Sequence, residues 1–195
     1  MKPITGRDGT PIIGIAGWKK SGKTTLTVRL VAEMTRRGYK VATIKHAHHS
    51  FQIDDAETDS ARHRRAGAAQ VAVVSRDRWA IIKELHDAPE PDFPALVRML
   101  DPCDLIIVEG YKSAPIPKIE ARRTASFTHQ PMTPGDPMVI AVAADHPTET
   151  DGRPVFSLDD IEGLANLIEA HVGLKRPTPA TEQARDRVAA GPDQS

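Results

Sequence analysis

The sequence has a single cysteine, Cys103, among its 195 residues. One thiol cannot form an internal disulfide, and it excludes the zinc sites that are built from several cysteines. No stretch approaches the roughly 18 consecutive apolar residues of a membrane-spanning helix. The N-terminal segment Met1–Asp8 also lacks the apolar part of a secretory signal peptide. We therefore expect a cytoplasmic protein without a membrane partner.

The chain also lacks an excess of charge of either sign. It has 26 Lys and Arg residues against 26 Asp and Glu residues. Because nucleic-acid-binding proteins usually carry a basic excess, the overall charge gives no basis for such a partner, and none is expected. The length suits one domain with a tail and is sufficient to bury a core without covalent cross-links.

The most specific feature present is a glycine-rich segment, Gly17-Trp18-Lys19-Lys20-Ser21-Gly22-Lys23-Thr24, which has the form G-x-x-x-x-G-K-T. It follows the apolar run Ile12–Ala16 and precedes a helical pattern that extends from Thr25 to Arg37. A strand, a glycine-rich turn and a helix N-terminus direct successive backbone N–H groups to one point, where a polyphosphate is stabilised. The sequence therefore predicts a phosphate-binding loop.

Several residue types in this loop suit a nucleotide. Gly17 and Gly22 permit backbone conformations and a close approach that a Cβ atom would obstruct. Lys23 can reach the β- and γ-phosphates, so we expect it to act in catalysis as well as binding, and the Thr24 hydroxyl can ligate Mg²⁺. The predicted nucleotide-contacting residues are Gly17, Lys19, Ser21, Gly22, Lys23, Thr24 and Thr25.

Short apolar runs rich in Val and Ile alternate with helical patterns along the chain, as in parallel sheets with both faces buried. The predicted strands are Ile12–Ala16, Lys40–Ile44, Gln70–Val74, Leu105–Val108 and Val139–Ala143, with weaker ones at Trp79–Ile82 and Pro154–Phe156. The predicted helices are Lys23–Arg37, Thr58–Ala66, Phe93–Leu100 and Leu158–Val172. This alternation predicts an α/β protein with the three-layer P-loop NTPase fold, a mostly parallel sheet with helices on both faces.

The domain organisation predicted from these patterns is simple. One nucleotide-binding domain covers residues 12–174, after a flexible N-terminus of residues 1–11. Residues 175–195 are polar, carry prolines and have Val188 as their one large apolar residue, so we expect a disordered tail.

Glu109 follows the predicted strand Leu105–Val108 and so lies at the C-terminal edge of the sheet, where ligands bind in open α/β folds. A carboxylate there can bind Mg²⁺ or orient an attacking water, because phosphoryl transfer depends on positioning and charge neutralisation. We expect Glu109 to be metal-ligating and catalytic. The alternative is a strand-end glutamate that hydrogen-bonds a neighbouring loop.

Three histidines, His46, His48 and His49, follow the second predicted strand. In an extended segment His46 and His48 point the same way, but two imidazoles without a third ligand make a poor zinc site. Hydrogen bonding to a phosphate or another anionic ligand suits them better, with solvent-exposed histidines as the alternative.

The helix predicted at Thr58–Ala66 has acidic residues at its start and basic residues at its end. This distribution complements the helix dipole, and capping alone explains it. Asp59 nevertheless stands at the helix entry, where nucleotide hydrolases place a metal-sensing carboxylate. Arg62 and Arg65 share one helical face, from which both can reach an anionic ligand. Both interpretations stay open.

The segment after Glu109 combines prolines with charges. Pro115 and Pro117 predict an exposed loop or edge strand, because proline cannot continue a central ladder. Lys118 then alternates with Glu120 and Arg122, either on a solvated edge or as a basic rim for an anionic second substrate or partner.

Asp145 follows the strand predicted at Val139–Ala143. A carboxylate at this position can accept both N–H groups of a guanine edge. An aspartate after a strand can instead cap a turn.

Taken together, these blocks resemble the family of molybdopterin-guanine dinucleotide biosynthesis protein B (MobB), over about Ile12 to Val172. The phosphate loop alone is shared by a vast superfamily, whereas the later blocks are specific in this order. The blocks that carry the resemblance are Gly17-x-x-x-Ser21-Gly22-Lys23-Thr24-Thr25-Leu26, Lys45-His46-x-His48-His49, Asp59-Ser60-x-Arg62-His63-Arg64-x-Ala66-Gly67-Ala68, Asp104-x-x-x-Val108-Glu109-Gly110-Tyr111-Lys112 and Pro117-Lys118-Ile119-Glu120.

The resemblance implies a GTP-binding protein that uses Mg²⁺, hydrolyses GTP weakly and assists the guanylyltransferase that attaches GMP to molybdopterin. It also implies a homodimer. One departure is Trp18, which stands where relatives that pair across a dimer often carry a lysine. The alternatives are a nucleotide-binding adaptor without useful turnover and a small-molecule P-loop kinase.

Molybdopterin itself is expected as a second ligand. Molybdopterin carries a phosphate, which basic side chains attract. Several histidine, arginine and lysine residues follow the predicted strand ends or the loops beyond them, where they would form a surface beside the GTP site. These residues are His46, His48, His49, Arg62, Arg65 and Lys118 with Arg122. The acidic rim of the guanylyltransferase is the alternative partner of this surface.

Overall fold

The computed structural model describes residues 4–47, 58–132 and 135–177. The contacts within the chain divide it into two compact units. One comprises Met1–His46 and Val97–Ser195, and the other comprises Ala47–Leu96. The domain predicted for residues 12–174 includes residues of both units.

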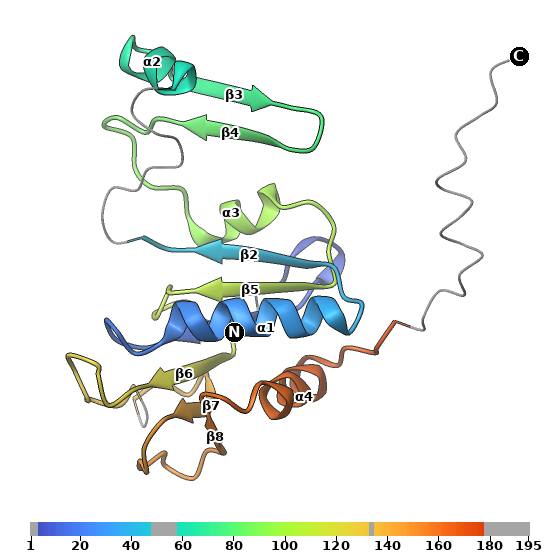
Figure 1. Cartoon of the computed structure of the whole chain (residues 1–195), viewed down its shortest axis with the longest axis vertical. Coiled ribbons are helices and arrows are strands. Elements are labelled where there is room, and N and C mark those ends of the chain that lie inside the picture. Colours follow the sequence, from blue (N-terminus) through green and yellow to red (C-terminus); the bar gives the residue numbers. More distant parts are fainter. Residues whose placement is uncertain (1–3, 48–57, 133–134, 178–195) are drawn as a thin grey trace, which may run out of the picture. The chain divides into compact units, whose positions relative to one another are not determined.

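The first unit contains a six-stranded sheet in which every neighbouring pair is parallel (Figure 1). Its order is β2 (Val41–Lys45), β5 (Leu105–Glu109), β1 (Ile12–Ala16), β6 (Lys118–Arg122), β7 (Val139–Ala144) and β8 (Val155–Ser157). The α/β class and the mostly parallel sheet are confirmed. All five residues of β1 and of β5 are buried, as their unbroken apolar runs predict.

Two helices, α1 (Lys23–Arg36) and α4 (Ile161–Val172), contribute to the main core. Leu26, Leu30 and Met34 recur every four residues on one stripe of α1, and all three are buried. This stripe packs with Ile13 and Ile15, the alternate residues of β1. The core therefore anchors both the strand before the glycine-rich loop and the helix after it.

Two shorter helical segments are the 3₁₀ turn η1 (Arg7–Gly9), which lies in the first unit, and α3 (Phe93–Met99), within which the boundary between the units falls. Across the described residues, none of the helices has both the length and the apolar character that crossing a bilayer requires.

In the described part of the N-terminal segment, two side chains make hydrogen bonds to backbone carbonyl groups. Thr10 Oγ1 donates to the carbonyl oxygens of Arg7 and Cys103, and the Arg7 guanidinium donates to the carbonyl oxygen of Arg98. Individual polar contacts of this kind leave no pattern in the sequence, so they could not be predicted from it.

The prediction of an edge strand or loop after Pro117 is wrong, because β6 lies between β1 and β7 inside the sheet. Both prolines precede the strand, so neither removes a donor from its ladder. The Pro117 carbonyl instead accepts the N–H of Gly14 at 2.8 Å, which adds to the pairing with β1.

The charged residues of β6 are buried, so this strand lacks the apolar pattern by which a buried strand is recognised in a sequence. Lys118 is 1% exposed, and its Nζ donates to Asp136 Oδ2 at 2.8 Å and to the carbonyl oxygens of Lys112 and Ala114. Arg122 pairs with Glu120 at 2.8 Å beneath the surface. Each charge is buried with a partner, which is the condition under which proteins tolerate it.

The second unit contains α2 (Asp59–Arg65) and a hairpin of β3 (Gln70–Val74) and β4 (Trp79–Lys83). The two strands pair antiparallel, so the prediction that Gln70–Val74 joins the parallel sheet is wrong. Thr58 caps α2 by accepting the N–H of Ala61, and the described part of α2 follows the predicted helix closely.

Candidate functional site

The glycine-rich loop connects β1 to α1 with the backbone geometry that the motif predicts. Gly17 has φ +144°, and a Cβ atom there would lie 2.5 Å from the carbonyl oxygen of Ala121 and from Ser21 Oγ. Gly22 has φ +90° and directly precedes the first residue of α1. Both positions therefore require glycine, and the loop ends at the N-terminus of α1, where backbone N–H groups can stabilise an anion.

Lys23 is the first residue of α1 and is partly buried. Its Nζ donates to the Trp18 carbonyl oxygen at 2.6 Å across the loop. Burial is the main cause that lowers the pKa of Lys23, the Glu109 carboxylate opposes this shift, and the ammonium groups of Lys112 and Lys45 reinforce it. An ammonium in such surroundings is stabilised by additional negative charge, which phosphates supply.

Thr24 and Glu109 meet at the C-terminal edge of the sheet. The Thr24 hydroxyl donates to Glu109 Oε1 at 2.6 Å, and the Glu109 side chain is 11% exposed. Hard oxygen donors of these two kinds suit Mg²⁺, which keeps several waters and takes its other ligands from a nucleotide. Thr24 and Glu109 therefore fit a magnesium ion.

The turn after β5 borders the same edge. The N–H of His46 donates to the carbonyl oxygen of Glu109 at 2.9 Å, and the His46 ring stacks on Tyr111 with 4.4 Å between centroids. Lys112 places its Nζ 3.7 Å from the centre of the Trp18 ring. Burial lowers the pKa of Lys112. Turn and loop are thus tied by a cation–π contact.

Asp145 lies beyond β7, in a pocket that it shares with the start of α1. The pocket is lined by Gly22, Thr25, Leu26, Arg29, Arg123, Asp145, Leu158 and Asp159. Hydrogen bonding from His146, and then from Thr124, lowers the pKa of Asp145 to about 2. Its Oδ1 accepts the N–H and hydroxyl of Thr124, so the turn-capping role of this aspartate is present.

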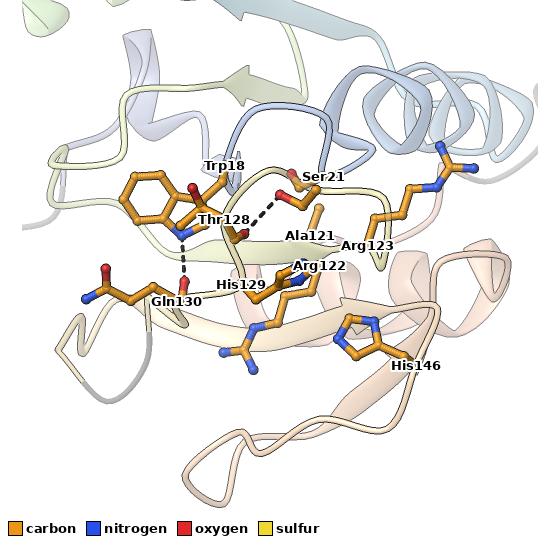
Figure 2. A pocket seen from close by; sticks show the side chains of 10 residues that line it. Trp18, Ser21, Ala121, Arg122, Arg123, Thr128, His129, Gln130 and His146 are labelled. Carbon is orange, nitrogen blue, oxygen red and sulfur yellow. Dashed lines mark hydrogen bonds between the residues drawn. The ribbon is translucent and has the colours of Figure 1, made fainter.

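The loop after β6 and the glycine-rich loop line the same pocket, as Figure 2 shows. The Trp18 indole N–H donates to the carbonyl oxygen of Gln130 at 2.6 Å (Figure 2). Ser126 Oγ donates to the carbonyl oxygen of Lys19. Arg122 and Arg123 leave the end of the strand in opposite directions. The Arg123 side chain is 53% exposed and lies 3.8 Å from Asp145.

The structure brings only some of the predicted site residues together. The loop residues Gly17 to Thr25, together with His46, Glu109 and Asp145, belong to one unit. Asp59, Arg62 and Arg65 belong to the other unit, where Arg62 pairs with Asp59 at 3.6 Å. His48 and His49 lie outside the described residues.

The geometry does not support Lys118 as a ligand-binding residue. Its ammonium is buried and bonded to Asp136 and two carbonyl groups, so it forms no basic rim. The error has a physical cause: Asp136 lies 18 residues away in the sequence, and no local pattern announces such a pair.

Two lysines and an arginine at this edge were not among the predicted site residues, although both lysines stand in the sequence blocks that carry the family resemblance. Lys45 lies 3.3 Å from Glu109, Lys112 covers Trp18, and Arg123 lines the Asp145 pocket. A signal existed for Lys45, because it directly follows the strand predicted at Lys40–Ile44, as Glu109 directly follows the strand predicted at Leu105–Val108. Its approach to Glu109 depends on which strands are neighbours, and that is a property of the sheet order.

The sequence matches the model of the family described as Molybdopterin guanine dinucleotide synthesis protein B (MobB) over residues 12–145. The matched region contains the phosphate loop, Glu109 and Asp145.

Named relatives cover most of the chain. A molybdopterin-guanine dinucleotide biosynthesis adapter protein of Haemophilus influenzae is 38% identical over 87% of this chain and 93% of its own. The Escherichia coli protein of the same name is 37% identical over 85% of this chain and 95% of its own. The crystal structure of a MobB homologue from Bacillus stearothermophilus is 27% identical, with a TM-score of 0.60, and covers 84% of this chain and 99% of that one.

Proposed function

The chain belongs to the MobB family, and we propose that it is a GTP-binding adapter protein of molybdopterin guanine dinucleotide biosynthesis. In this role it assists the guanylyltransferase that joins GMP to molybdopterin. The relatives at 37% and 38% identity carry the adapter name, which supports the role in the pathway.

One observation carries the nucleotide-binding part of the proposal. The Thr24 hydroxyl and the Glu109 carboxylate lie 2.6 Å apart, directly beside a glycine-rich loop that ends at a helix N-terminus. The loop supplies N–H groups and Lys23 for the phosphates, and the two oxygen ligands supply a place for Mg²⁺. GTP and Mg²⁺ are thus the ligands that we assign to this edge of the sheet.

Guanine recognition is assigned to the pocket that contains Asp145. The pocket adjoins Gly22 and Thr25, so a nucleotide whose phosphates occupy the loop can extend its base in this direction. Asp145 Oδ1 already accepts from Thr124, whereas Oδ2 lies 3.8 Å from Arg123. A guanine edge would therefore engage Oδ2 and compete with Arg123.

Slow hydrolysis of GTP by the isolated protein follows from the position of Arg123. This arginine lines the pocket beside the loop, but it is 53% exposed and only loosely paired with Asp145. An arginine fixed beside the transferred phosphate is worth about 10³–10⁵ in rate. Hydrolysis by this chain is expected to be slow unless a partner orders or supplies such a group.

The test of nucleotide binding is calorimetric titration of GTP with Mg²⁺ into the wild-type protein and Lys23→Ala. Removing the ammonium should weaken GTP binding about 10- to 100-fold, the value of a charge-assisted hydrogen bond. Lys40→Ala is the matched control, because it removes the same charge just before β2, at the opposite end of that strand from the site. Wild-type affinity in a folded Lys23→Ala variant would exclude the assignment.

Competition between GTP and ATP in the same titration tests the base assignment. Equal displacement by ATP would contradict guanine recognition by Asp145. Asp145→Asn should reduce the preference for GTP while it leaves phosphate binding intact, because Asp145 lies outside the phosphate loop.

We also propose molybdopterin as a second, anionic ligand of the basic residues Arg62 and Arg65. Both lie in the last turn of α2, and the Arg62 side chain is 64% exposed. Attraction between these groups and a phosphate weakens as salt rises. Titration of molybdopterin at two salt concentrations, with Arg62→Ala/Arg65→Ala as the variant, tests this: unchanged binding would leave the arginines as helix-end complements.

The homodimer is assigned to the hairpin of the second unit. The side chains of Ala72, Val74, Trp79 and Ile81 share one face of the hairpin, since Ala72 pairs with Ile81 and Val74 with Trp79. Val74, Trp79 and Ile81 are between 57% and 73% exposed. A two-stranded hairpin is marginally stable in water, and a second copy presents the same apolar face to cover it.

A further inference from the structure

The side chain of Lys45 contacts both groups that we assign to Mg²⁺. Its Nζ lies 3.3 Å from Glu109 Oε1 and 3.4 Å from Thr24 Oγ1. The same carboxylate oxygen accepts the Thr24 hydroxyl at 2.6 Å. One ammonium therefore bridges the hydroxyl and the carboxylate that a metal ion would bridge.

The register of the sheet fixes the position of this lysine. Lys45 and Glu109 are Cα partners in the parallel pair of β2 and β5, and Glu109 in turn pairs with Ile15 of β1. All three residues are thus held at one edge by strands. The Lys45 side chain is 59% exposed, so the ammonium itself has room to move away on its long stem.

We propose that Lys45 is an internal cation that competes with Mg²⁺ for Thr24 and Glu109. The inference rests on the proposed function of this edge as a GTP and Mg²⁺ site. Without the metal, the ammonium neutralises Glu109 and holds the two oxygen ligands together. When Mg²⁺ enters with GTP, repulsion between the cations displaces the ammonium, and the phosphates of the nucleotide accept it.

This arrangement makes metal binding depend on the nucleotide. When Mg²⁺ binds alone, the Lys45 ammonium leaves Glu109 and has no other anionic partner. When Mg²⁺ binds with GTP, the phosphate oxygens become that partner. Lys23 does not serve this purpose in the structure, because its Nζ is bonded to the Trp18 carbonyl oxygen. Lys45 is therefore a positioning residue for the metal ligands.

The experiment removes the charge and keeps the apolar stem, with Lys45→Met. Mn²⁺ is titrated into the nucleotide-free protein, and the free ion is measured by electron paramagnetic resonance. We expect Mn²⁺ to bind about tenfold more tightly to Lys45→Met than to the wild type, because repulsion from a partly exposed ammonium is moderated by solvent. The Mg²⁺ concentration that supports half-maximal GTP binding should fall by a similar factor.

Two controls separate this effect from a general change in charge. Lys45→Arg keeps the cation and should behave as the wild type. Lys40→Met removes an equal charge just before the same strand, and it should leave Mn²⁺ binding unchanged. Circular dichroism establishes that each variant is folded.

Equal or weaker Mn²⁺ binding by folded Lys45→Met overturns the inference, and so does an equal shift in Lys40→Met. If the wild-type protein binds no GTP at any Mg²⁺ concentration, the proposed function is wrong. The Mn²⁺ titration still decides the role of Lys45 in that case, because it needs no nucleotide.

Discussion

Glu109 is a nearly buried carboxylate that contacts the hydroxyl of Thr24 and the partly exposed ammonium of Lys45. Its side chain is 11% exposed, against 59% for Lys45. A carboxylate inside a protein is stabilised by opposite charge and by hydrogen-bond donors, and here the charged partner is a side chain that is more than half exposed. Such a group is well placed to exchange its partner for Mg²⁺ or for a water that the metal orders.

We predict that Glu109→Gln lowers the rate of GTP hydrolysis more than it lowers GTP affinity. Gln keeps the size of the side chain and its hydrogen bond with Thr24, but it removes the charge that binds the metal or orients the attacking water. Single-turnover hydrolysis and equilibrium binding of GTP measure the two effects separately. Equal hydrolysis rates in the two proteins would exclude Glu109 from catalysis and favour an adaptor without turnover.

At the scale of elements, α1 and α4 are joined by a buried arginine. The Arg37 side chain is 3% exposed, and its guanidinium contacts Glu33 at 2.7 Å and Glu169 at 2.8 Å. Glu33 belongs to α1 and Glu169 to α4, so this network orients the two helices that pack with the sheet. Truncation of Arg37 would leave two carboxylates without their shared partner.

Arg37→Met should destabilise the protein by about 2 kcal/mol. This is less than the roughly 3–5 kcal/mol lost when a fully buried pair is broken, because Arg36 still pairs with Glu33 and Arg176 with Glu169. Urea unfolding at pH 7 measures the change. Lys40→Met provides a control for the loss of one charge, since the Lys40 side chain is exposed and its backbone N–H donates to Asp104, outside this network.

The same network predicts a pH dependence of stability. Hydrogen bonds from Arg36 and then Arg37 lower the pKa of Glu33 from 4.5 to about 2. A carboxyl group with a depressed pKa stabilises the folded state above its unfolded pKa and loses that contribution as pH falls toward its folded pKa. The free energy of unfolding should therefore fall from about pH 5 toward pH 2, and less steeply in Arg37→Met. Parallel acid profiles in the two proteins would contradict the assignment.

Elements with continuous apolar patterns could be predicted from the sequence, and those built on paired charges could not. The strand at Ile12–Ala16 and the helix that starts at Lys23 are placed correctly, because their patterns repeat with the period of each element. Lys118–Arg122 was misplaced, since its charges are buried only through partners such as Asp136. Charge pairing across loops leaves no periodic signal.

At the scale of the whole molecule, the parts of the candidate site that could be predicted are those that depend on short stretches of sequence. The glycine-rich motif and the rule on strand ends brought Thr24 and Glu109 to one edge, and their hydrogen bond is present. Lys45 was missed because its contact with Glu109 depends on strand order. The second unit was missed as well, since Gln70–Val74 has the apolar character of a parallel strand but pairs in a hairpin.

The exposed face of that hairpin leads to the prediction for the assembled protein. Val74 is 73% exposed, Trp79 65% and Ile81 57%, so a contiguous apolar face is presented to water. Faces of this kind commonly mark protein interfaces. We expect a homodimer in which two copies of the hairpin cover each other.

Light scattering coupled to size-exclusion chromatography should give the mass of a dimer for the wild type and of a monomer for Trp79→Lys/Ile81→Lys. Two lysines on the apolar face repel their counterparts across a symmetric contact, since each substitution appears in both copies. Val28→Lys is the matched control, because Val28 is 62% exposed on α1, outside the hairpin, and its replacement should leave the dimer intact. A wild-type monomer would contradict the homodimer itself. A dimer that persists in the folded double variant would move the interface to another part of the chain.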